Sequence, residues 1–160
     1  MMMKKTVTTN VTRLLAAKKI DFTVHDYVDS GAVAGQDVAA ALGENPDDVF
    51  KTLVTVGKSG AHYVFVVPVA KELDLKKAAK AVGEKHVEMI KSKELLPLTG
   101  YVHGGCSPIG MKKELPTVID ASAADRERIF FSGGKIGCQV ELRVCDLPAV
   151  LNFRFEYVTD

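Results

Sequence analysis

The sequence predicts a single α+β domain, residues 1–160, in which helices surround a mixed β-sheet. Apolar runs of strand length alternate along the chain with short amphipathic stretches of helical period. No repeat, linker or low-complexity run divides the chain, and its 160 residues are enough to bury roughly 70% of the unfolded surface around one core. Such a mixture of elements around one core indicates an α+β fold.

The first half of the chain predicts a β-hairpin that follows two short helices and a strand. A threonine at position 8 or 9 can cap the first helix, and Gly43 can end the second. Asn45 and Pro46 begin a turn that leads into an apolar run, and residues 57–60 form the turn that brings the chain back. We expect helices at residues 8–20 and 36–42 and strands at residues 22–27, 49–56 and 62–69.

The second half predicts a basic helix, an irregular glycine-rich loop and further short strands. In residues 73–82 the apolar side chains fall on one side and the lysines mostly on the other, which is typical of a solvated helix face. Residues 99–110 are rich in glycine and follow no regular period. We expect helices at residues 73–82, 91–96 and 146–151 and strands at residues 87–90, 117–119, 129–132 and 138–142.

The composition excludes several classes of protein. Lys plus Arg is 21 and Asp plus Glu is 20, so a nucleic acid would have to be bound by a local patch. The longest apolar stretches, such as residues 63–67, are too short to span a membrane, and residues 1–5 lack the apolar core of a signal peptide. The three cysteines include no Cys-x-x-Cys pair, so neither a disulfide framework nor a zinc site is predicted. We expect a cytoplasmic protein.

Lys51 stands in the middle of the otherwise apolar run at residues 49–56. A lone ammonium in apolar surroundings is costly unless it finds a partner. Proteins keep such a charge where it does chemistry or binds an anion. This segment alone leaves two interpretations open: a functional cation, or an edge-strand side chain whose head reaches water.

Two glycine-rich segments, residues 99–110 and 131–137, can bring backbone amides close to a ligand. Adjacent glycines allow close approach and can aim their N–H groups at an oxyanion or a phosphate. The second segment lies between two predicted strands, so a hairpin turn explains it without a ligand. Neither segment has the glycine spacing and following helix of a dinucleotide or Walker loop.

Cys106 and His103 lie three residues apart in the first of these segments. A Cys/His pair can act as a nucleophile and base. No acidic residue in that loop orients the imidazole, and two ligands do not make a metal site. A packed cysteine is the favoured interpretation.

Six segments together are more specific than any one of them. In chain order they are Phe22-x-Val24-His25-x-Tyr27, Phe50-Lys51-Thr52-Leu53, Leu75-Lys76-Lys77-Ala78-Ala79-Lys80, Val87-Glu88-Met89, Gly100-Tyr101-x-x-Gly104-Gly105-x-Ser107-Pro108-x-Gly110 and Ser132-Gly133-Gly134-Lys135-x-Gly137. This series closely resembles the YbaK/EbsC family, the bacterial Cys-tRNA(Pro) deacylases related to the editing domain inserted in prolyl-tRNA synthetases. The likeness runs from about residue 8 to residue 151.

The resemblance implies a trans-editing hydrolase, an aminoacyl-tRNA deacylase that cleaves the ester of mischarged Cys-tRNA(Pro). Its fold would be a mixed, partly barrel-like sheet surrounded by helices. It would need no metal and no organic cofactor, because the thiol of the cysteinyl group is thought to attack its own ester carbonyl. Its partners would be aminoacyl-tRNA(Pro) and, in a transient complex, prolyl-tRNA synthetase.

The resemblance also assigns roles to residues. Lys51, Gly104 and Tyr27 would be catalytic, with the Gly104 amide facing the scissile carbonyl. Four further residues would bind substrate: Thr52, Gly105, Ser132 and Gly133. Without the resemblance, Tyr27 reads as an amphipathic residue at a strand end. The lysines at positions 76, 77, 80 and 85 are candidates for contacts with acceptor-stem phosphates.

The sequence departs from the family pattern in places, and the first of these departures leaves the aminoacyl substrate open. The loop from Tyr27 to Gly35 is shorter than in typical members, and Ala34 stands where an aromatic residue often lies. Ile136 replaces a common arginine, and Cys106 replaces an apolar residue. A deacylase for another aminoacyl-tRNA, such as Ala-tRNA(Pro), and a non-catalytic module that binds tRNA or a synthetase are therefore the alternatives.

Overall fold

The computed structural model describes residues 8–160, so residues 1–5, for which no signal-peptide core was expected, lie outside the described residues. The strands are β1 (Phe22–Asp26), β2 (Phe50–Gly57), β3 (His62–Pro68), β4 (Val87–Met89), β5 (Thr117–Asp120), β6 (Arg128–Lys135), β7 (Cys138–Arg143) and β8 (Arg154–Glu156). The α-helices are α1 (Asn10–Ala17), α2 (Gly35–Leu42), α3 (Leu75–Val82) and α4 (Ser92–Thr99). Short 3-10 helices lie at η1 (Val28–Ser30), η2 (Pro46–Asp48), η3 (Ala121–Asp125) and η4 (Val144–Ala149).

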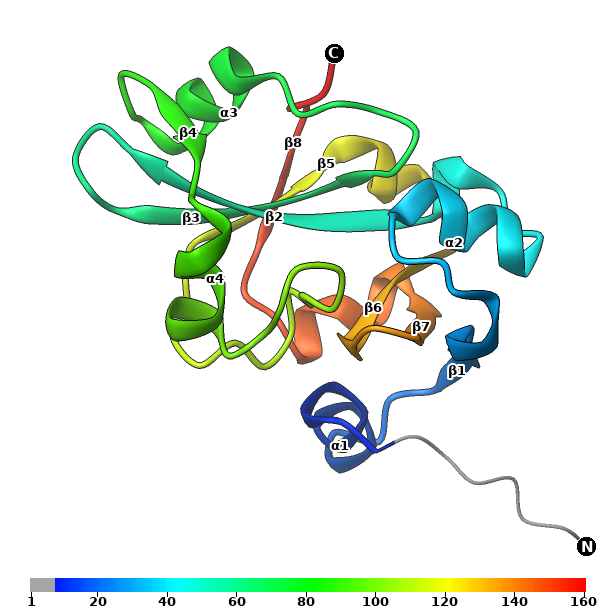
Figure 1. The fold of residues 1–160 in the computed structure, drawn as a ribbon. Coiled ribbons are helices and arrows are strands. Elements are labelled where there is room, and N and C mark those ends of the chain that lie inside the picture. Colours follow the sequence, from blue (N-terminus) through cyan, green and yellow to red (C-terminus); the bar gives the residue numbers. More distant parts are fainter. Residues whose placement is uncertain (1–7) are drawn as a thin grey trace, which may run out of the picture.

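The strands form two sheets, where the sequence predicted one. The first is antiparallel with the order β1-β7-β6, and the second is mixed with the order β4-β2-β3-β5-β8 (Figure 1). A bridge between Val49 and Phe130 joins them at one point. The α+β class is confirmed, and the sheets do not close into a barrel.

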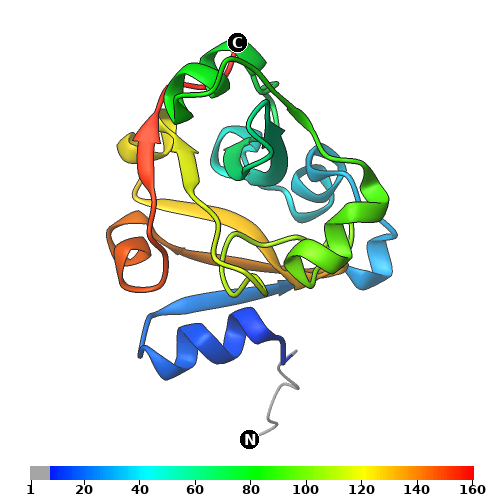
Figure 2. The same cartoon turned by 90° about the vertical axis from the view of Figure 1, so that its left-hand side faces the viewer.

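The two sheets share the main core. Its buried apolar residues include Phe50, Val54, Val64 and Val66 of the mixed sheet and Phe131, Val140 and Leu142 of the antiparallel sheet. Helix α1 adds Val11 and Leu15 to this core from one end of the molecule, and α3 covers a second cluster at the opposite end (Figures 1 and 2).

The predicted strands all occur, whereas the helix ends and the last elements differ. Helix α3 begins two residues later than expected, because the Asp74 side chain accepts the amides of Lys76 and Lys77 and so caps it. The expected helix at 146–151 is the 3-10 helix η4, which contains Pro148. Strand β8, which pairs in parallel with β5, was not predicted. Within residues 8–160, no helix is long and apolar enough to cross a membrane.

Candidate active site

A cleft of about 740 Å³ opens beside strand β2. Strand β3 pairs with β2 along its whole length, but β4 pairs only with Thr55–Gly57. Among the described residues, the other edge of β2 has no strand beside residues 51–53, because the bridge at Val49 lies before this stretch and the Ile90 amide donates to the Val54 carbonyl after it. The cleft lies along this open edge, between α2, α4, the loop at 100–110 and the antiparallel sheet.

The ladder pattern decides which backbone groups face the cleft. The bonds Val69 N→Val49 O and Gly57 N→Ala61 O show that odd-numbered residues of β2 exchange hydrogen bonds with β3. The N–H and C=O of Thr52 consequently point to the open edge. The cleft thus contains main-chain donors and acceptors as well as side chains.

Lys51 lines the cleft as a half-buried cation. Its side chain is 27% exposed, and Nζ lies 3.8 Å from Oε1 of Glu72, whose own side chain is 81% exposed. An ion pair with so exposed a partner contributes little to stability. The ammonium can therefore exchange Glu72 for an anionic group of a ligand. Lys51 lies at a locally open edge and also faces the cleft, and its catalytic role stays a prediction.

Thr52 points to the opposite face of β2, because successive side chains of a strand alternate. Its Oγ1 is buried and has no hydrogen-bond partner. Among the described residues, the only other buried side-chain oxygen or nitrogen in that condition is Oε1 of Gln139, and both residues line the cleft. Buried polar atoms without partners are rare and point to function or to a missing ligand contact.

Tyr27 and Ser132 reach the cleft from the antiparallel sheet. Tyr27 follows β1 and is 6% exposed, and burial raises the pKa of its hydroxyl, so the phenol is a neutral hydrogen-bonding group at pH 7. Ser132 lies on β6 directly opposite Gln139 of β7. Its Oγ accepts a bond of 3.1 Å from the Gly134 amide, which holds the hydroxyl at the cleft.

The two glycine loops pack against each other. Gly104 lines the cleft with φ +85°, a left-handed conformation that favours glycine, and a Cβ there would lie 2.6 Å from Cγ1 of Val33. A Cβ on Gly105 would lie 2.9 Å from the backbone of Lys135 and Ile136 in the second loop. The amide of Gly105 donates to the carbonyl of Val102. Of this glycine pair, only Gly104 presents its backbone to the cleft.

The structure brings five of the seven predicted site residues to one cleft: Lys51, Thr52, Tyr27, Gly104 and Ser132. Gly105 and Gly133 lie behind it. Gly133 is buried against Cys138, its carbonyl accepts a 2.6 Å bond from the Thr9 hydroxyl, and it has no room for a side chain. Gly105 and Gly133 therefore help to pack the loop that carries Gly104 and the strand that carries Ser132.

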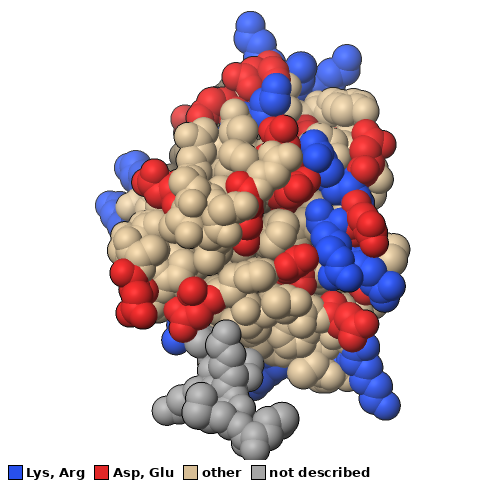
Figure 3. Space-filling view, turned by 90° about the vertical axis from the view of Figure 1, so that its right-hand side faces the viewer, with Lys and Arg blue, Asp and Glu red and all other residues tan. Residues whose placement is uncertain are grey.

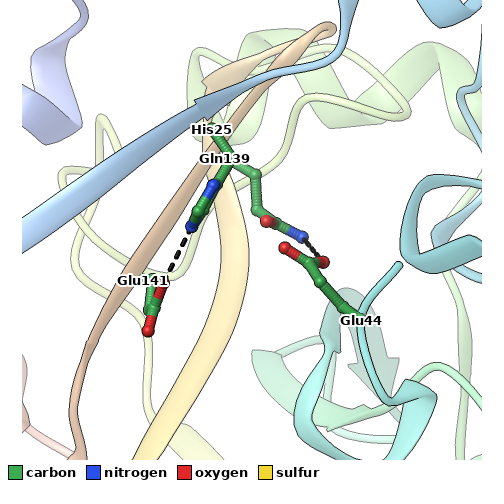
Figure 4. A network of polar contacts seen from close by, with 4 residues as sticks. All are labelled: His25, Glu44, Gln139 and Glu141. Carbon is green, nitrogen blue, oxygen red and sulfur yellow. Dashed lines mark hydrogen bonds and ion pairs between the residues drawn. The ribbon is translucent and has the colours of Figure 1, made fainter. Parts of the chain in front are cut away.

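Sequence reasoning missed a polar network beside Ser132 (Figure 4). Nε2 of Gln139 lies 2.9 Å from Oε1 of Glu44, and Nε2 of His25 lies 2.8 Å from Oε1 of Glu141. The alternation Cys138, Val140, Leu142 could have shown that Gln139 and Glu141 share the face opposite the core. Glu44 could not have been found, because it lies in a loop far away in sequence.

Cys106 and His103 both line the cleft, but the thiol is not poised for attack. Cys106 is 8% exposed, and burial raises the pKa of its thiol to about 12. A thiol with that pKa is protonated at pH 7, as expected of a packed cysteine. In the part of the chain that the structure describes, no group of three or more His, Cys, Asp or Glu residues is placed to hold a metal ion.

The surface charges are mixed. Figure 3 shows basic and acidic side chains interspersed on one face, with Lys and Arg gathered along one side of it. Helix α3, which carries three of the four predicted phosphate-binding lysines, contributes no residue to the cleft, and Nζ of Lys77 bonds to the carbonyl of Thr159.

The family model of the aminoacyl-tRNA editing domain matches residues 30–149, a range that contains β2, both glycine loops and Gln139. This chain belongs to that family. The sequence resemblance and the predicted activity class, an aminoacyl-tRNA deacylase, are thereby confirmed.

Relatives of this editing domain are named for the deacylation of aminoacyl-tRNA, for trans-editing or for the charging of tRNA with proline. EbsC of Enterococcus faecalis, named as a candidate Cys-tRNA(Pro)/Cys-tRNA(Cys) deacylase, is 42% identical over 152 residues, which are 94% of this chain and 93% of EbsC. A proline–tRNA ligase of Shouchella clausii is 31% identical over 63% of this chain and 18% of the ligase. The crystal structure of a candidate trans-editing enzyme for prolyl tRNA synthetase matches with a TM-score of 0.81 at 22% identity, over 97% of this chain and 99% of that one, and confirms the fold.

Proposed function

We propose that this editing domain deacylates mischarged Cys-tRNA(Pro) in trans. The observation that carries the proposal is the cleft at the open edge of β2, where Lys51, Thr52 and Gly104 meet Tyr27 and Ser132. The name of EbsC, which is similar over nearly the whole chain, supports the choice of substrate.

In the proposed reaction the Gly104 amide donates to the ester carbonyl oxygen as negative charge develops on it. Such a donor is worth about 3 kcal/mol in comparable acyl-transfer sites. The Lys51 ammonium stabilises the ribose oxygen that leaves, and Tyr27 and Ser132 hold the substrate by hydrogen bonds. Breaking the ion pair with Glu72 costs little, because the Glu72 side chain is exposed.

The nucleophile in this proposal is the thiol of the cysteinyl group, since the Cys106 thiol stays protonated. The sulfur bonds to the carbonyl carbon, the ester C–O bond breaks, and the ribose oxygen takes the proton that the thiol gives up. The products are a cyclic thiolactone and free tRNA. The protein contributes position and electrostatic stabilisation.

Prolyl-tRNA synthetase is the proposed partner that selects the tRNA. The net charge of +1 gives this domain little general attraction for tRNA. In this proposal the cleft of about 740 Å³ takes the aminoacylated 3′ end and not the rest of the tRNA. Exposed lysines of α3, Lys76 and Lys80, and the nearby Lys85 are proposed to contact acceptor-stem phosphates. Cytoplasmic location is part of this proposal, because the substrate arises where tRNA is charged.

The test is a deacylation assay with Cys-tRNA(Pro), Ala-tRNA(Pro) and correctly charged Pro-tRNA(Pro). We expect turnover of the cysteinyl substrate and a loss of roughly a hundredfold in Lys51→Ala, because an electrostatic stabiliser of the leaving oxygen is removed. The control is Lys58→Ala, which removes an exposed lysine from the turn after β2.

Three outcomes would overturn parts of the proposal. Full activity of Lys51→Ala would exclude the assigned role of the lysine. Turnover of Ala-tRNA(Pro) in preference to Cys-tRNA(Pro) would replace the substrate. Binding of all three tRNAs without turnover would indicate a non-catalytic module.

A further inference from the structure

Gln139 is a polar side chain in the wall of the cleft that the proposed reaction does not use. It is 2% exposed, and its amide is held at one end only: Nε2 bonds to Glu44, whereas Oε1 is buried without a partner. A buried amide oxygen left unbonded costs free energy, so its retention calls for a partner from outside the chain.

The carboxylate of Glu44 fixes which way this amide faces. An ionised carboxylate can only accept hydrogen bonds, so the NH₂ end of Gln139 donates to it (Figure 4), and the amide oxygen is left as an acceptor without a partner in the chain. The other end of the amide is therefore a dedicated acceptor, and what binds it must be a hydrogen-bond donor.

The position of Gln139 places this acceptor beside the substrate. Ser132 of β6 lies directly opposite Gln139, and His25 of β1 lies opposite it on the other side. The three side chains form one row across a single face of the antiparallel sheet, because directly paired residues point the same way. Ser132 also lines the cleft, so a ligand at Ser132 lies next to Gln139.

The local charge favours a cationic donor. Glu141 is already paired with His25, whereas Glu44 bonds to a neutral amide. The positive charge of Lys51 lies on the opposite face of β2 from Thr52, near Glu72. Asp37 and Glu72 also line the cleft, and Glu44 adds an acidic group directly behind Gln139, so this part of the cleft suits the ammonium end of an aminoacyl ester.

We propose that Gln139 accepts a hydrogen bond from the α-amino group of the aminoacyl substrate, and that Glu44 is the positioning residue that orients its amide and supplies negative charge. This inference rests on the proposed function. It gives the site a way to recognise the amino acid by its amine, which is a donor whether protonated or neutral. Thr52, the other buried group without a partner, lies across the same cleft.

The test compares two substrates that share the thiol and differ in the amine: Cys-tRNA(Pro) and tRNA(Pro) acylated with 3-mercaptopropionate. We expect Glu44→Ala to lower kcat/KM for the cysteinyl substrate roughly tenfold, the usual effect of losing a bond to a charged group, and to leave the deamino substrate unchanged. Gln139→Leu should do the same. Glu44→Gln keeps an acceptor for Nε2 and should lose less than Glu44→Ala. Glu127→Gln, at an exposed glutamate outside the cleft, is the matched control.

An equal loss on both substrates would overturn the inference, because a merely structural Glu44 supports both alike. So would a wild-type enzyme that does not distinguish the two substrates. Binding of a non-hydrolysable probe, 3′-cysteinylamino-3′-deoxyadenosine against its deamino analogue, measures the same contact without turnover. If the wild-type protein cleaves neither ester but binds the cysteinylamino probe more tightly, the proposed function fails and the amine contact stands; equal binding of the probes refutes the contact.

Discussion

Replacement of Gly104 by alanine tests the geometry of the catalytic loop. The new Cβ would lie 2.6 Å from Cγ1 of Val33, about 0.8 Å closer than the 3.4 Å at which ordinary contact begins. Either Val33 or the loop must shift by that amount. A displacement on the order of 1 Å in a reacting group costs roughly a hundredfold in rate, so we expect kcat/KM of Gly104→Ala to fall by a factor of tens.

Gly60→Ala provides the matched control for backbone strain. Gly60 has φ +91° against +85° for Gly104, and its surroundings are open to 4 Å. Alanine in the left-handed region should cost each variant about 1 kcal/mol, which corresponds to a Tm lower by roughly 2–4 °C in a protein of this size. Only Gly104→Ala should lose deacylation of Cys-tRNA(Pro). If it keeps half or more of the wild-type rate at an equally lowered Tm, the Gly104 amide does not face the reacting carbonyl.

Three further predictions concern buried polar groups. Cys106→Ala should change kcat less than twofold and add no ionisation to the pH–rate profile, because a thiol of pKa about 12 stays protonated; a hundredfold loss would make it the nucleophile. Thr52→Val should keep or raise Tm while kcat/KM falls roughly tenfold, since it removes an unbonded buried hydroxyl; a lower Tm would indicate a structural bond. Burial raises the pKa of Glu44, so ionisation of Glu44 costs stability as pH rises through that pKa. Glu44→Gln should therefore raise Tm at pH 7, with a gain that vanishes below about pH 4, and a gain independent of pH would refute this cause.

Local patterns were enough to locate the hairpin that carries Lys51. Strand β2 and its partner β3 are joined by a short turn, and their apolar residues give the period of a strand. The glycine-rich segments that carry Gly104 and Ser132 were also visible, because adjacent glycines indicate close approach of the backbone. The resemblance to a family then supplied the roles.

Contacts between distant segments were beyond the reach of those patterns. Glu44 and Gln139 are 95 positions apart, and nothing near either residue indicates that they meet. Strand β8 has three residues, too few to show a period, and it is held by parallel pairing with β5. The division into two sheets likewise depends on which strands pair, which the strand sequences alone do not specify.

The open edge of β2 has a consequence for solubility as well as for chemistry. An unpaired strand edge is a template on which a strand of another chain can add, and natural proteins guard such edges with charge, most often lysine. Lys51 stands on this edge, where joining two copies would bring two ammonium groups into a desolvated ladder. The lysine that we propose to serve the reaction therefore also opposes strand addition, so the weakly active Lys51→Ala protein should associate at lower concentrations than the wild-type protein.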